Sequence, residues 1–208
     1  MRTRIAASIL GLGLALSTTA EAQRRRGLVD VSPSGDRHGF WLNLGIAHGD
    51  ERYKFAGDRS WTVGPAKPSF SLRMGGTVNP NFRLGGEVTG WVNQTTVDGE
   101  RATEYLAGLL LVGQFYPSRR AGLFLKGGAG FSRSGVSVYG PGDSGEDGFA
   151  WSVGAGYEVK LSRSLFLTPT IDLMQHRSDG SVVDGIREPA LYERLLQVGV
   201  ALTIQPGR

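Results

Sequence analysis

The chain has 208 residues, a formal net charge of +4 and no cysteine, which excludes disulfide bonds and cysteine-ligated metal sites. Its 32 glycines are about twice the usual share of a soluble protein and argue against long helices, because glycine destabilises a helix interior. The length is that of a single domain.

The N-terminus has the three regions of a secretory signal peptide. Arg2 and Arg4 provide its positive charge, residues 5–16 form a short apolar run, and Ala20-Glu21-Ala22 offers small residues for cleavage. The run is too short for a transmembrane helix, and no stretch of about 18 apolar residues occurs elsewhere. We therefore expect residues 1–22 to be removed after Ala22 and the mature protein to be exported.

Residues 23–37 are polar and contain glycine, proline and serine, which predicts a flexible periplasmic segment before the folded domain of residues 38–208. Much of the net charge comes from Arg24-Arg25-Arg26 in this segment. We interpret these arginines as a solvated tail and expect no nucleic-acid partner.

The rest of the chain alternates between apolar residues and small or charged ones, which is typical of two-faced β-strands. The clearest case is residues 149–161, where every odd position is apolar and every even position is small or charged. At about 3.3 Å per residue this strand is long enough to cross a bilayer when it is tilted. In chain order, eight strands are predicted near residues 40–47, 68–78, 82–93, 105–115, 123–132, 149–161, 165–173 and 192–204.

One strand does not show which of its faces is apolar. In residues 105–115 both parities are rich in leucine, valine and aromatic residues, and only Gln114 suggests the inward face. The parity of this fourth strand therefore stays open.

Short and long connections alternate along the chain. Short turns are predicted at residues 79–81, 117–120 and 162–164, and long loops near residues 49–66, 95–103, 134–148 and 177–190. Transmembrane barrels have short periplasmic turns and long extracellular loops, and closure satisfies every backbone hydrogen bond in hydrocarbon. The sequence therefore predicts an all-β fold, an eight-stranded antiparallel up-and-down transmembrane β-barrel with short periplasmic turns and long extracellular loops.

The signal peptide, the eight alternating strands and the rhythm of turns and loops resemble the small bacterial outer-membrane β-barrels of the OmpA-like and OmpX-like type. The resemblance covers nearly all of the mature chain, but the chain ends at Arg208 without the terminal aromatic residue that such barrels carry. It implies a monomer in the outer membrane, with lipids, lipopolysaccharide and the outer-membrane assembly machinery as partners. A soluble lipocalin-like barrel is the alternative fold, and it would place its apolar parity inside.

Seven charged residues share the inward parity of the predicted strands. The interior of an eight-stranded barrel is just filled by side chains, so we expect these groups to pair and block the lumen. A structural or surface-interaction role without catalysis follows, and a narrow solute pore is a third possibility that would need a gap in the network. The predicted network consists of Arg73, Arg83, Glu87, Lys126, Glu158, Lys160 and Asp172.

His176 and Ser178, followed by Glu188, resemble the motif of the outer-membrane lipid A deacylases. The resemblance implies Ser178 as nucleophile, His176 as its base and Glu188 as the residue that orients the base. Asp179 stands where that family has asparagine, and the strand parity turns His176 toward the lumen, whereas the family's residues face the lipid. Deacylation is therefore the alternative to the non-enzymatic interpretation.

No metal or cofactor is expected. His38, His48 and His176 are too scattered for a metal site, and the acidic residues of 140–148 lack the order of a calcium-binding loop.

Overall fold

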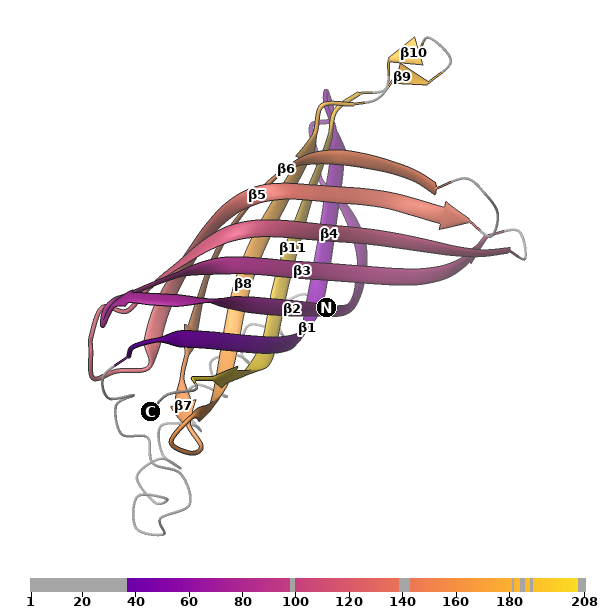
Figure 1. Ribbon diagram of the computed structural model, residues 1–208. Helices are drawn as coiled ribbons and strands as arrows, with labels where there is room; N and C mark the ends of the chain where they lie inside the picture. Colours follow the sequence, from indigo (N-terminus) through magenta and orange to yellow (C-terminus); the bar gives the residue numbers. More distant parts are fainter. Residues whose placement is uncertain are drawn as a thin grey trace.

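The computed structural model describes residues 37–97, 100–138, 143–180, 182–183, 186–187 and 189–205. Their main sheet has the order β11-β1-β2-β3-β4-β5-β6-β8-β7, and β11 also pairs with β8, so the sheet closes into a barrel (Figure 1). Because β6 and β7 both pair with β8 on the same side, they together form one strand of the wall. The barrel therefore has eight strands. Its strands are β1 (Phe40–Phe55), β2 (Thr62–Asn79), β3 (Phe82–Val97), β4 (Glu100–Phe115), β5 (Leu123–Val138), β6 (Asp143–Tyr157), β7 (Val159–Lys160), β8 (Leu165–Ser178) and β11 (Leu191–Ile204).

Each neighbouring pair of strands in the wall is antiparallel, as predicted for an up-and-down barrel. The ladder closes around the barrel, while at the loop end β2 and β3 are paired only as far as Ser69 and Trp91 and β6 and β8 only as far as Gly148 and Ser178. No described helix has the length and apolar character needed to cross a membrane.

The barrel is apolar outside and polar inside. Leu111 is 64% exposed on the outer surface, whereas Arg73 is 1% exposed in the interior. A lipocalin-like barrel would have the opposite distribution. The structure also shows which face of the fourth strand points inward, because Leu106 and Leu110 are buried in the lumen while Leu109 and Leu111 face outward.

The two ends of the barrel differ. At the turn end lie the links 80–81, 116–122 and 161–164. Both ends of the described chain lie there too, since Thr77 N donates to Gly39 O and Gln205 N donates to Ser164 O. The hairpin of β9 (Val182–Val183) and β10 (Ile186–Arg187) projects from the opposite, loop end (Figure 1).

Three of the four predicted long loops are mostly strand, which corrects their lengths. The link between β1 and β2 is residues 56–61, β3 and β4 extend to Val97 and from Glu100, and β5 and β6 extend to Val138 and from Asp143. Polar residues here still complete the backbone ladder, so loss of apolar alternation marks the edge of the apolar band and not the end of the strand. The fourth loop holds β9 and β10.

Pro169 lies within β8, where it produces no bulge. The β8 register to β11 is continuous, and its register to β6 and β7 is unchanged across Tyr157 and Glu158. Tyr157 is the residue that would pair with Pro169. Because Pro169 has no backbone N–H, the hydrogen-bond ladder is interrupted between β6 and β7, while the register stays the same. The parity of β8, including His176, is therefore preserved.

Candidate functional site

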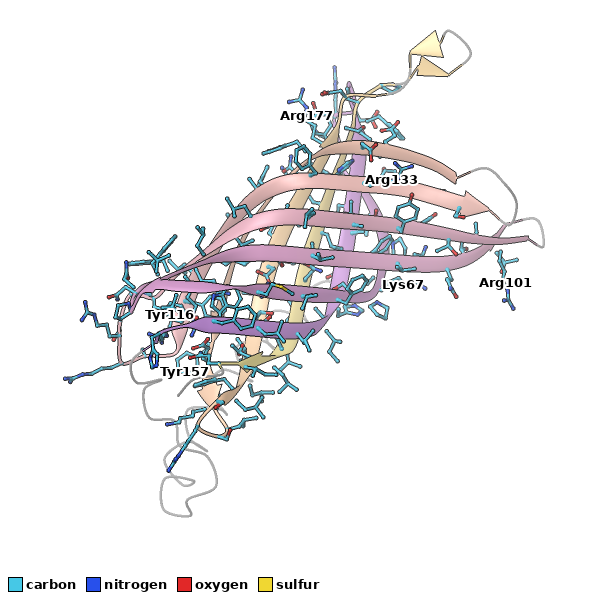
Figure 2. All side chains as sticks on the ribbon, in the orientation of Figure 1. Lys67, Arg101, Tyr116, Arg133, Tyr157 and Arg177 are labelled. Atoms are coloured by element: carbon cyan, nitrogen blue, oxygen red, sulfur yellow. The ribbon has the colours of Figure 1, made fainter. Side chains whose placement is uncertain are left out.

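The lumen is filled from the turn end to a cavity at the loop end. Tyr116 and Tyr157 mark the turn end, while Arg101, Arg133 and Arg177 lie toward the other end (Figure 2). Between them the inward side chains form two charged layers, one apolar layer and an acidic cavity.

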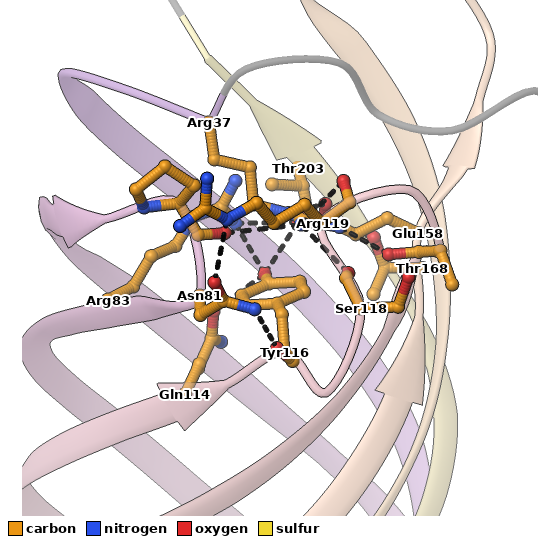
Figure 3. Close-up of polar contacts among 12 residues, drawn as sticks. Arg37, Asn81, Arg83, Gln114, Tyr116, Ser118, Arg119, Glu158, Thr168 and Thr203 are labelled. Atoms are coloured by element: carbon orange, nitrogen blue, oxygen red, sulfur yellow. Dashed lines mark hydrogen bonds and ion pairs between the residues drawn. The ribbon is translucent and has the colours of Figure 1, made fainter.

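The turn-end cluster consists of Arg37, Arg83, Tyr116 and Glu158 (Figure 3). Arg83 Nη1 lies 2.6 Å from Glu158 Oε1 and donates to the Tyr116 hydroxyl at 2.7 Å. The Arg37 guanidinium stacks 3.7 Å from the Tyr116 ring centroid, and its Nε lies 3.7 Å from Glu158 Oε2. This cluster closes the turn end of the lumen.

The central ring is a closed cycle of Arg73, Glu87, Lys126 and Asp172, one each from β2, β3, β5 and β8. Arg73 contacts Glu87 at 2.9 Å and Asp172 at 2.7 Å. Lys126 contacts the same two carboxylates at 2.7 and 2.9 Å. Each cation therefore touches both anions, and the ring is electrically neutral.

The wall leaves room for this ring where a glycine faces it. A Cβ on Gly154 would lie 2.0 Å from Asp172 Oδ1, so only glycine fits opposite that carboxylate. Charges removed from water must be matched closely to be tolerated. The alternating contacts of the ring provide that match.

Six of the seven residues of the predicted network form buried ion pairs, divided between the turn-end cluster and the central ring. Lys160 lies opposite Phe166 in the β7–β8 pair and is half-buried, and it makes no ion pair within the part of the chain that the structure describes. The prediction that Lys160 belongs to the network is therefore corrected. Arg37, assigned to the flexible segment, is instead buried in the turn-end cluster.

An apolar layer separates the central ring from the loop end. Its side chains are buried against one another across the lumen. Water and ions therefore meet a second barrier above the charged layers. The layer comprises Trp91, Leu106, Leu110, Val112, Ala150, Met174 and Leu195.

Above the apolar layer lies a cavity of about 760 Å³, which we call the cup. Four carboxylates line it, from Glu51 on β1, Glu104 on β4, Glu146 on β6 and Glu193 on β11. Glu193 accepts a hydrogen bond from Ser134 at 2.8 Å. The cup is thus an acidic chamber with an apolar floor.

Among the described residues of the deacylase motif, His176 and Ser178 make their hydrogen bonds to other partners and not to each other. His176 is fully buried in the lumen, and its Nδ1 lies 2.6 Å from Ser132 Oγ. Ser178 instead donates to Glu146 and accepts from Leu191 N at 3.2 Å. Glu188 lies outside the described residues. Neither His176 nor Ser178 is on the lipid-facing surface, where an acyl chain would approach.

Basic and aromatic side chains meet on the outer surface near the loop end. Arg194 lies 4.1 Å from the Trp61 ring centroid, Lys54 lies 5.2 Å from the same centroid, and Arg177 lies 5.6 Å from that of Tyr192. On β11 the outward residue below Arg194 is Leu196, so the group borders the apolar band. We call Lys54, Trp61, Arg177, Tyr192 and Arg194 the basic-aromatic patch.

Sequence reasoning missed Glu51 and Glu193 at the cup. Glu51 continues the inward parity of Asn43 and Gly49 on β1, but it falls in a segment predicted as loop. Glu193 likewise continues the inward parity of Leu195. Extending each parity past the apolar band would have found both residues.

Comparisons with known proteins agree with the barrel. The family model of the outer membrane protein beta-barrel domain matches residues 8–201. The crystal structure of Neisserial surface protein A (NspA) superposes with a TM-score of 0.53 and 16% identity, covering 82% of this chain and 98% of that one. At this identity the likeness concerns the fold alone.

Two further structures are similar at lower scores. Ail of Yersinia pestis, in complex with the heparin analogue sucrose octasulfate, has a TM-score of 0.46 and 13% identity over 78% of this chain and 99% of that one. OprG of Pseudomonas aeruginosa has a TM-score of 0.44 and 12% identity over 83% of this chain and 99% of that one. A search of curated proteins found no match.

The central ring can be tested by neutralising one member. Glu87→Gln should lower the free energy of unfolding by about 3–5 kcal/mol, because two buried cations would then face one carboxylate. Asp147→Asn is the control, since Asp147 pairs with Arg133 on the exposed surface. Denaturant titration of both variants in lipid vesicles, followed by tryptophan fluorescence, measures the difference. Equal stability of the two variants would contradict the assigned role of the ring.

Proposed function

The chain belongs to the outer membrane protein beta-barrel domain family, and on this premise we propose that it is a non-enzymatic, non-conducting barrel that acts through its outer surface. Its apolar outer wall places it in the outer membrane of a Gram-negative-type envelope, in contact with lipid. With the turn end in the periplasm, the loop end and the cup face the outside.

The observation that carries this proposal is the filled lumen. The turn-end cluster, the central ring and the apolar layer are stacked between the periplasmic end and the cup. A solute would have to separate buried ion pairs and then displace packed apolar side chains. Two barriers of different chemistry favour a closed barrel over a narrow pore.

The closed ladder also bears on the oligomeric state. All eight strands of the wall have both neighbours within one chain, so closure of the barrel needs no second copy. A monomer, inserted by the outer-membrane assembly machinery, is the state we propose.

Lipopolysaccharide is the partner that the basic-aromatic patch favours. Arg194 and Lys54 project beside Trp61 where the apolar band ends, at the level expected for the phosphates of the outer leaflet. Arginine and lysine bind phosphate, and aromatic side chains favour the membrane interface.

Planar-bilayer recording tests the closed lumen. Folded wild-type protein should produce no stepwise conductance, because the two charged layers and the apolar layer occupy the lumen. A large porin in the same bilayer serves as the positive control. Regular conductance steps from protein whose β content is confirmed by circular dichroism would overturn the proposal.

Incubation with purified lipopolysaccharide tests the surface role and the absence of catalysis together. Wild type should bind it and release no fatty acid, and the Lys54→Gln/Arg194→Gln variant should bind at least about tenfold more weakly, since each lost charge contact is worth about 1 kcal/mol. Arg101→Gln, another exposed arginine but outside the patch, is the control.

Two results would count against this function. Fatty-acid release by wild type that Ser178→Ala abolishes would establish the deacylase. Equal binding by the patch variant and the control would remove the patch as the lipid contact.

A further inference from the structure

The cup is a chamber that opens outward and ends blind. Its floor is formed by Trp91 and by the apolar layer to which Trp91 belongs. Its volume of about 760 Å³ lies within the range of small-molecule sites, which is about 300–1,000 Å³. A small molecule from outside could enter the cup but could not continue through the barrel.

The described lining of the cup is acidic. None of the described residues that line it is basic, whereas Glu51, Glu104, Glu146 and Glu193 all contribute carboxylates. The basic residues of β1 and β11, such as Arg52 and Arg194, occupy the outward parity. On these two strands acid lies inside and base outside, and the acidic lining favours a positively charged occupant.

Glu51 and Glu193 are the most buried of these acids, at 7% and 6% exposure. Both lie beyond the lipid-facing band, because their outward neighbours Asp50, Arg52 and Arg194 are charged. Burial, followed by the charge of Glu104, raises the pKa of Glu51 to about 7. Burial raises the pKa of Glu193 to about 8, and the charge of Glu51 contributes to that rise.

With both pKa values raised, the two carboxyl groups retain a proton near neutral pH. Of the other titratable groups that face them, Glu104 and Glu146 are acidic. Burial lowers the pKa of His176, which lies 3.8 Å from Glu193, so its imidazole is neutral at this pH. The pair therefore has no resident cation among the described residues.

Buried polar atoms at the cup also lack partners. Glu193 Oε2 accepts no hydrogen bond from the described protein, and the indole Nε1 of Trp91 donates none. Both side chains line the cup and are more than nine-tenths buried. An unsatisfied buried acceptor of this kind is matched by a ligand that brings a donor.

The aromatic lining selects the type of cation. Tyr53, Phe55 and Trp91 border the cup beside the carboxylates. Aromatic faces attract ammonium groups and cover alkyl chains. A metal ion fits less well, since no three potential metal ligands converge among the described residues.

We propose that the cup binds small organic ammonium compounds, whose ammonium group lies at Glu51 and Glu193. The N–H groups of the ligand then donate to the two carboxylates, one proton is released to solvent, and the alkyl chain lies against the aromatic lining. The site is separate from the basic-aromatic patch and does not depend on lipopolysaccharide binding.

Calorimetric titration of the full barrel in detergent micelles with 1,5-diaminopentane tests this site. Wild type should bind with one-to-one stoichiometry and release a proton, which buffers of different ionisation enthalpy reveal. Affinity should rise at least about tenfold from pH 6 to pH 8.5, because the proton competes below the raised pKa values of the pair. Glu51→Gln/Glu193→Gln should weaken binding at least about tenfold, while Asp147→Asn, outside the cup, should not change it.

The control ligand is 1-pentanol, which keeps the chain length without the charge. Absence of diamine binding by wild type, or binding without proton release, would overturn the proposal, as would equal affinity for the alcohol. These measurements use wild type alone, so they decide the question even if the double variant does not fold. Failure here would leave the bilayer and lipopolysaccharide experiments unaffected.

Discussion

The paired charges inside the barrel are the interaction on which the rest of the structure depends. Glycine-rich strands close into a narrow barrel whose lumen excludes most water, so any charge there must find its partner on another strand. The central ring meets this demand with four contacts among Arg73, Glu87, Lys126 and Asp172. Because its members come from β2, β3, β5 and β8, the ring also ties distant parts of the wall together.

The layers of the lumen give the two ends of the protein different chemical character. Ion pairs close the turn end, an apolar layer follows, and only above it do the strands enclose an open cup. The same strand extensions carry acids inward and bases outward, as Glu193 and Arg194 show. One alternating backbone therefore provides a lipid-facing band, a basic patch on the outside and an acidic chamber on the inside.

Much of this arrangement could be predicted from alternation alone. Arg73 and Glu87 share the inward parity of strands joined by a short turn, and the register places them opposite each other. Arg37 could not be predicted, because nothing in a polar N-terminal segment shows that one residue folds back into the lumen. The prediction of a loop over residues 49–66 misses Glu51, because outside the membrane a strand needs no apolar face. Lys160 has the inward parity, but parity does not reveal whether a cation finds an anion.

Thiol accessibility tests the closed lumen most directly, since the natural chain has no cysteine and each introduced thiol is unique. Ser152→Cys places it in the lumen, where Ser152 is 3% exposed, and Val136→Cys places it at the cup, where Val136 is 37% exposed. With folded barrels in vesicles and a membrane-impermeant maleimide, Val136→Cys should react readily and Ser152→Cys should stay unmodified until the protein is unfolded. Labelling of both thiols at similar rates in the folded barrel would contradict a blocked lumen.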